Sequence, residues 1–170
     1  MQQEIIDKIA KIKLLITDVD GVLTDGKIYL GTNSLEFKAF HVHDGKGIKL
    51  LQEAGVEVAI ITGRQSEAVS NRAKELAIKD AYQGVKDKIA VFNNLLERYN
   101  LSSDQVAYIG DDINDLEVLT KVGFSASVAN GVAKVKERVD YVTEKAGGEG
   151  ALRELAELIL SNNLQLTIDN

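Results

Sequence analysis

Short apolar segments alternate with segments of helical periodicity along the chain. The apolar segments have the length and composition of strands and lie at 13–17, 56–62, 81–82, 105–110, 123–128 and 140–142. Between them, apolar residues recur at three- and four-residue spacing over 2–11, 45–54, 66–76, 87–99, 115–121, 132–138 and 151–160. Strands that alternate with helices are typical of parallel sheets. The pattern therefore predicts an α/β fold with a Rossmann-like parallel sheet covered by helices on both faces.

The segment 26–40 departs from this alternation of strands and helices. Its side chains alternate in character on both sides of a Gly-Thr-Asn-Ser turn, which predicts a β-hairpin. Because the segment follows the first strand, the hairpin would project over the carboxyl edge of the sheet. An isolated hairpin is only marginally stable in water, so we expect it to pack against something else, and a neighbouring subunit is one candidate. Residues 161–170 are expected to form a loose tail.

Length and composition indicate a globular protein with one domain over 1–170. A chain of 170 residues can bury a sizeable core, and 45% of its residues are hydrophobic. No apolar run is long enough to span a bilayer, and residues 1–8 lack the basic-then-apolar order of a signal peptide. We therefore expect a cytoplasmic protein without a membrane partner. The absence of cysteine excludes disulfides, thiolate catalysis and zinc–thiolate sites.

The charge balance argues against nucleic acid as a partner. The net charge is −6 and only 5% of the residues are aromatic, whereas nucleic-acid binders usually carry a basic patch and often a stacking platform. A small anionic substrate is still compatible with this charge, because a divalent cation and a few lysines or arginines set the local field.

Two carboxylates, Asp18 and Asp20, follow the first apolar segment directly. A carboxylate at the end of a buried strand costs desolvation free energy unless a cation or hydrogen bonds compensate it. Ligands of open α/β sheets bind outside the carboxyl ends of the strands, so the pair indicates a metal site at that edge. The alternative is an Asx turn closed by Gly21.

Three further segments carry polar groups that such a site needs. Thr62 ends the second long apolar segment, Lys88 opens a predicted helix, and the sequence 110–115 contains three aspartates. Each has a structural alternative when taken alone. Thr62 could cap a helix, Lys88 could be a solvated helix residue, and the aspartates could stabilise a helix N-terminus.

Together, the four segments resemble the four motifs of the haloacid dehalogenase superfamily of phosphotransferases: Asp-x-Asp-x-Thr/Val, a strand-terminal Ser/Thr, a lysine and an acidic pair. The resemblance implies that Asp18 is the nucleophile, which forms an aspartyl-phosphate. It also implies that Asp20 is the general acid for the leaving alkoxide and then the base for water.

The same resemblance implies a Mg²⁺ cofactor and a phosphate site. Mg²⁺ would be held by Asp18, the backbone carbonyl of Asp20 and Asp111, with Asp112 and Asp115 in support. The phosphoryl oxygens would be bound by Thr62, Gly63 and Lys88.

The chain lacks room for the cap domain that most superfamily members carry. The gap between Thr24 and Val56 holds only the hairpin and one helix, and the gap between Arg64 and Lys88 only a helix and a short strand. The whole chain resembles the capless 3-deoxy-D-manno-octulosonate 8-phosphate phosphatases, in the strings at 16–26, 40–48, 62–66 and 147–154. That family implies hydrolysis of the 8-phosphate ester on the way to lipopolysaccharide, and a homotetramer assembled through the hairpin.

Four basic residues are candidates for binding the rest of the substrate: His43, Arg64, Arg72 and Arg153. Arg64 could be an exposed helix residue, but its guanidinium could also pair with the carboxylate of the sugar acid. Relatives that act on nine-carbon 9-phosphates tend to have Glu after Thr-Gly, so Arg64 favours the eight-carbon substrate. A nine-carbon keto-sugar acid 9-phosphate and a catalytically silent regulatory subunit are the alternatives, and the intact motif residues argue against the second.

Overall fold

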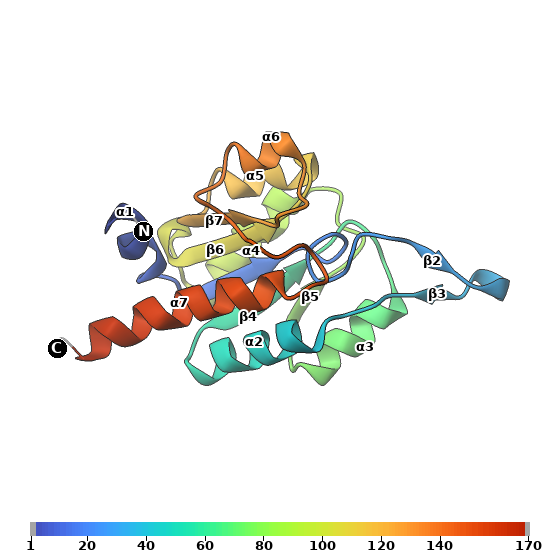
Figure 1. The fold of residues 1–170 in the computed structure, drawn as a ribbon, viewed down its shortest axis with the longest axis horizontal. Helices are drawn as coiled ribbons and strands as arrows, with labels where there is room; N and C mark the ends of the chain where they lie inside the picture. Colours follow the sequence, from blue (N-terminus) through green and yellow to red (C-terminus); the bar gives the residue numbers. More distant parts are fainter. Residues whose placement is uncertain (1–2, 169–170) are drawn as a thin grey trace.

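Six parallel strands form the central sheet of the computed structural model, which describes residues 3–168 (Figure 1). The strand order is β5-β4-β1-β6-β7-β8, so the first strand of the chain lies inside the sheet. The strands are β1 (Leu14–Thr17), β4 (Glu57–Ile61), β5 (Asp80–Tyr82), β6 (Val106–Gly110), β7 (Phe124–Ser127) and β8 (Tyr141–Val142). Each strand overlaps an apolar segment of the sequence, and the predicted α/β fold is confirmed.

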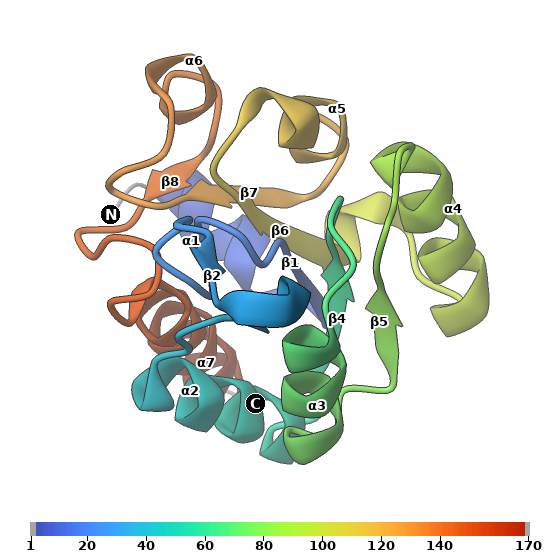
Figure 2. The same cartoon turned by 90° about the vertical axis from the view of Figure 1, so that its right-hand side faces the viewer.

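Helices cover both faces of this sheet (Figure 2). One face packs against α1 (Gln3–Ile9), α2 (Val42–Glu53), α3 (Glu67–Glu75) and α7 (Ala151–Ile168), and the other against α4 (Lys88–Tyr99), α5 (Leu116–Leu119) and α6 (Ala133–Lys136). Successive side chains of a strand point to opposite faces. Leu15 of β1 accordingly joins the core beneath α2 and α7, while Leu14 and Ile16 join the core beneath α4.

The last helix is longer than the sequence pattern predicted. We expected a helix over 151–160 and a loose tail over 161–170, but α7 continues to Ile168. The segment 161–168 contains neither glycine nor proline, so nothing in it ends the helix. Residues 169–170 lie outside the described part of the chain. Within the described part, none of the helices combines the length and apolar character that crossing a membrane requires.

The predicted hairpin is present and extends away from the body of the molecule (Figure 1). Its strands are β2 (Tyr29–Leu30) and β3 (Glu36–Phe37), joined through the short 3₁₀ helix η1 (Thr32–Ser34). Several of its apolar side chains are exposed, including Leu30 (73%) and Phe37 (56%). The described residues contain no cap domain, and the hairpin is the element that stands beside the carboxyl edge of the sheet.

Candidate active site

The ends of three central strands are level with one another and bring the predicted site residues together. Thr17 of β1 is in register with Ile60 of β4 and with Ile109 of β6. Asp18 extends this ladder by one residue, since its backbone N–H donates to the Ile109 carbonyl at 3.1 Å. Asp18 is only 5% exposed. Its carboxylate therefore lies at the middle of the sheet edge.

The loop after Asp18 makes a tight turn that is anchored in the core. The backbone N–H groups of Val22, Leu23 and Thr24 all donate to the Val19 carbonyl, at 3.2, 2.9 and 3.1 Å. Gly21, inside this turn, has a φ of 95°. A Cβ atom on Gly21 would lie 2.1 Å from Oδ2 of Asp111. Glycine is therefore required here both for the backbone conformation and to leave space for the Asp111 carboxylate.

Replacement of Gly21 by alanine is expected to displace the Asp111 carboxylate and to weaken binding of a divalent cation about 10- to 100-fold. Gly55→Ala is a matched control, because Gly55 has a φ of 81° and a Cβ there would meet no atom within 4 Å. Both substitutions place alanine at a positive φ, and only Gly21→Ala adds the clash. Titration calorimetry with Mg²⁺ on both proteins measures the difference, and equal affinities would contradict this role of Gly21.

Three carboxylates converge beside the turn. Asp18, Asp111 and Asp115 each offer an oxygen, and these oxygens lie within 4.8 Å of one another. Burial, together with the charge of Asp115, raises the pKa of Asp18 to about 6. Burial and the charges of Asp18 and Asp115 raise the pKa of Asp111 to about 7. Oδ1 of Asp111 is buried without a hydrogen-bond partner among the described residues. This excess of negative charge and the unpaired oxygen fit a bound divalent cation.

Lys88 is the cation that the structure places within this acidic cluster. Its Nζ lies 3.1 Å from Oδ2 of Asp18 and 2.7 Å from Oδ1 of Asp115. Burial alone would lower the pKa of Lys88, but the charges of Asp18 and Asp115 outweigh it and raise that pKa. The ammonium therefore remains charged at the sheet edge, beside the carboxylate predicted to be the nucleophile.

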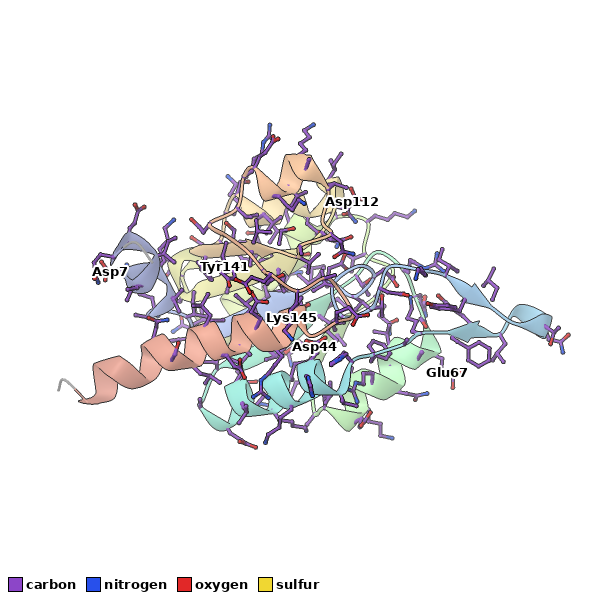
Figure 3. All side chains as sticks on the ribbon, viewed as in Figure 1. Asp7, Asp44, Glu67, Asp112, Tyr141 and Lys145 are labelled. Carbon is purple, nitrogen blue, oxygen red and sulfur yellow. The ribbon has the colours of Figure 1, made fainter. Side chains whose placement is uncertain are left out.

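Both carboxylate oxygens of Asp115 accept hydrogen bonds from neighbouring residues. Oδ1 accepts a hydrogen bond from the Tyr108 hydroxyl at 2.6 Å as well as from Lys88. Oδ2 accepts the backbone N–H groups of Asp111 and Asp112 at 3.1 and 3.3 Å. These contacts suit the supporting role predicted for Asp115. Asp112 accepts the Ile113 N–H at 2.6 Å and lies on the side of the molecule that carries α5 and α6 (Figure 3).

A cavity of about 280 Å³ opens in front of the carboxylates. Asp18 and Asp111 lie on its wall beside Thr62, Gly63 and Arg64, which come from the end of β4. The complete lining is Asp18, Asp20, Gly26, Thr62, Gly63, Arg64, Asp111, Asp112 and Asn114. The cavity thus combines acidic oxygens, a hydroxyl and a guanidinium, which is the chemistry that a metal-bound phosphate ester of an acid requires.

Three of the predicted substrate contacts lie away from this cavity. Arg72 pairs with Glu75 at 2.9 Å and lies over the ring of Phe40. Arg153 pairs with Glu157 at 2.6 Å, and together with His43 it lines a second cavity of about 440 Å³. Lys145, near the start of α7 in Figure 3, lines that second cavity too. Their roles toward a substrate stay predictions.

Sequence reasoning missed three residues that complete the site, Tyr108, Lys38 and Glu36. Tyr108, which holds Asp115, could have been noticed as the tyrosine of an otherwise apolar strand. Lys38 and Glu36 of the hairpin reach Asp20 and Arg64 respectively. Alternating polarity in the hairpin indicated which residues share a face, but it did not indicate that this face meets the loop after β1.

Comparison with known proteins agrees with this geometry. Residues 82–155 match a family model described as haloacid dehalogenase-like hydrolase. The 3-deoxy-D-manno-octulosonate 8-phosphate phosphatase KdsC of Escherichia coli K12 is 48% identical over 157 residues, which cover 92% of this chain and 84% of the relative.

Two solved structures extend the likeness to the whole fold. The 3-deoxy-D-manno-octulosonate 8-phosphate phosphatase of Yersinia pestis has a TM-score of 0.95 and 43% identity, covering 98% of this chain and 90% of that one. The enzyme of Moraxella catarrhalis, in complex with magnesium ion, phosphate ion and KDO, has a TM-score of 0.93 and 43% identity, covering 99% and 98%. This chain therefore belongs to the 3-deoxy-D-manno-octulosonate 8-phosphate phosphatase family of haloacid dehalogenase-like hydrolases.

Proposed function

We propose that this protein is a Mg²⁺-dependent phosphatase that hydrolyses 3-deoxy-D-manno-octulosonate 8-phosphate to the free sugar acid and phosphate. The observation that carries the proposal is the buried Asp18 carboxylate, which lies against Lys88 and next to Asp111 at the wall of a polar cavity. The close relatives bearing this enzyme name supply the substrate.

Asp18 attacks the phosphorus of the ester in this mechanism. A bond forms between the Asp18 carboxylate and phosphorus, and the bond from phosphorus to the sugar oxygen breaks. Asp20 gives its proton to the leaving oxygen. Asp20 then takes a proton from water, which attacks the aspartyl-phosphate, releases phosphate and regenerates Asp18.

Other residues at this edge of the sheet would neutralise and orient the phosphoryl group. Lys88 and the Thr62 hydroxyl would bind phosphoryl oxygens, and Gly63 leaves the backbone accessible beside them. Asp18, Asp111 and the backbone carbonyl of Asp20 would hold Mg²⁺, with Asp112 and Asp115 in support. When bound, Mg²⁺ offsets the repulsion between the carboxylates and the phosphate dianion. Arg64 would pair with the carboxylate of the sugar acid.

Mg²⁺ affinity should fall steeply as the solution becomes acidic. The metal-free pKa values of about 6 for Asp18 and about 7 for Asp111 mean that protons compete with the cation below neutral pH. We expect the Mg²⁺ dissociation constant to be at least about ten-fold larger at pH 5.5 than at pH 8. Titration calorimetry across this range tests it. Asp111→Asn should flatten the dependence, and an unchanged slope in that variant would contradict the assignment.

A substrate panel tests the proposed reaction. Phosphate release in Mg²⁺ is measured for 3-deoxy-D-manno-octulosonate 8-phosphate, a nine-carbon keto-sugar acid 9-phosphate and simple sugar phosphates. We expect a strong preference for the eight-carbon ester. Preference for the nine-carbon ester would replace the substrate but keep the chemistry. No release from any ester would indicate a silent regulatory subunit.

The hairpin gives a basis for proposing assembly. Its exposed Leu30 and Phe37 would be covered if copies of the chain pack through the hairpins into a homotetramer. Light scattering in solution measures the mass, and a monomer would contradict the proposal. Formation of the free sugar acid would serve lipopolysaccharide synthesis, and the cytoplasm is the location that this role predicts.

A further inference from the structure

Lys38 is a buried lysine that the reaction described above does not use. It follows β3 of the hairpin, and its side chain is only 2% exposed. Lysine is almost never buried so completely unless it is paired. Its Nζ donates to Oδ1 of Asp20 and lies 3.3 Å from Oε1 of Glu36. Lys38 thus connects the hairpin to Asp20 in the active site.

The contact with Lys38 places the two carboxylate oxygens of Asp20 in different environments. Lys38 holds Oδ1, whereas Oδ2 is buried without a hydrogen-bond partner among the described residues. Arg64 Nε is 3.9 Å from Oδ2, which is too long for a hydrogen bond. Asp20 lines the cavity that would receive the ester. One carboxylate oxygen is therefore held by Lys38, and the other has no hydrogen-bond partner among the described residues.

The ammonium of Lys38 is itself held in place. Glu36 binds Lys38 and also accepts a hydrogen bond from Arg64 Nη2 at 3.1 Å. Two acids and two cations therefore form one connected network from the hairpin to the end of β4. Such a network fixes geometry better than an isolated ion pair, because each side chain is restrained from two sides.

We propose that Lys38 is a positioning residue, which binds Oδ1 of Asp20 and so turns Oδ2 toward the oxygen of the leaving group. A proton donor contributes only when it lies within hydrogen-bond reach of the atom that it protonates. Through Lys38, the hairpin becomes part of the proton-transfer apparatus. The inference rests on the proposed function, because it requires Asp20 to act as the general acid.

The test compares two esters of nearly equal size. Phenyl phosphate needs protonation of its leaving group, whereas the nitro group of p-nitrophenyl phosphate makes its phenolate leave readily without it. We expect Lys38→Met to lower kcat/KM for phenyl phosphate about 10- to 100-fold and for p-nitrophenyl phosphate less than about three-fold. Lys38→Arg should restore much of the loss. Equal losses on both esters would overturn the proposal.

Controls separate this role from general damage. Lys27→Met makes the same replacement in the hairpin at a side chain that is 73% exposed, and it should behave as the wild type. If Lys38→Met does not fold, as judged by thermal unfolding, Lys38→Gln takes its place. In an Asp20→Asn background, Lys38→Met should change the phenyl phosphate rate by less than about two-fold, and a full additional loss would overturn the proposal.

The wild-type enzyme is measured first, on the sugar-acid ester and on both aryl esters. Turnover of the aryl esters without turnover of 3-deoxy-D-manno-octulosonate 8-phosphate would refute the proposed substrate. The comparison of the two aryl esters would still decide the role of Lys38. Failure of the proposed substrate and failure of the proposed role of Lys38 are therefore distinguishable.

Discussion

Asp18→Asn should abolish phosphate release, with a loss in kcat of roughly 10⁵-fold, comparable to removal of other covalent nucleophiles. The amide has the shape of the carboxylate but cannot attack phosphorus. The backbone N–H of residue 18 would still donate to the Ile109 carbonyl. The side chain would therefore keep its position at the sheet edge, because that hydrogen bond does not depend on the side-chain charge. The measurement is phosphate release from 3-deoxy-D-manno-octulosonate 8-phosphate at saturating Mg²⁺.

The same variant should be more stable than the wild type when Mg²⁺ is absent. Burial, followed by the charge of Asp115, raises the folded-state pKa of Asp18 to about 6, above the ordinary value of 3.8. The stability linked to this proton is complete below the unfolded value and is lost as the pH rises through about 6. At pH 8, the Asp18→Asn substitution thus removes an unfavourable charge, and Tm in EDTA should rise. An inactive variant with a lower Tm would point to misfolding.

Lys88→Met should be the most destabilising change at the site. Lys88 is 5% exposed and neutralises Asp18 and Asp115, so its removal leaves two buried carboxylates without their cation. Breaking a buried ion pair from one side costs about 3 to 5 kcal/mol. Urea unfolding at pH 8 measures the loss. Activity should fall together with stability, because the same ammonium is proposed to bind the phosphoryl group.

The control for Lys88→Met is Lys86→Met, two residues earlier at an exposed position. It should leave the free energy of unfolding within about 0.5 kcal/mol of the wild type, as most surface substitutions do. Acidification offers a second check, since protonation of Asp18 near pH 6 removes part of the repulsion. The deficit of Lys88→Met should therefore shrink between pH 8 and pH 5. A constant deficit would contradict the electrostatic explanation.

Periodicity predicted most of the fold because each element carries its signal locally. Apolar runs mark β1, β4 and β6, and helical spacing marks the helices over them, so Asp18, Thr62 and Asp111 could be assigned to one sheet edge in advance. Parallel strands present their carboxyl ends on the same side of the sheet, so residues that directly follow neighbouring strands lie close together. The length of α7 was misjudged because a loose tail was expected over 161–170, although the segment 161–168 contains neither glycine nor proline to end the helix.

Contacts between the hairpin and the body could not be predicted in the same way. Whether Lys38 meets Asp20 depends on the angle at which the hairpin leaves the sheet, and no local pattern encodes that angle. Arg72 is a second case, in which the role toward a substrate stays a prediction. Its residue type fits substrate binding, yet in the structure its guanidinium is engaged by Glu75 and Phe40. Residue type indicates what a side chain can do, while packing decides what it faces.

The interior place of the first strand has a consequence for how the protein is made. β1 is synthesised before both of its partners, which come from 57–61 and 106–110. Pairings between distant segments slow folding, since a long loop must close before any contact forms. A nascent chain that ends before residue 110 therefore carries Asp18 without the strand that positions Asp111. Metal capture must therefore await the synthesis of β6, and until then one edge of the apolar β1 stays unpaired, a condition that favours aggregation.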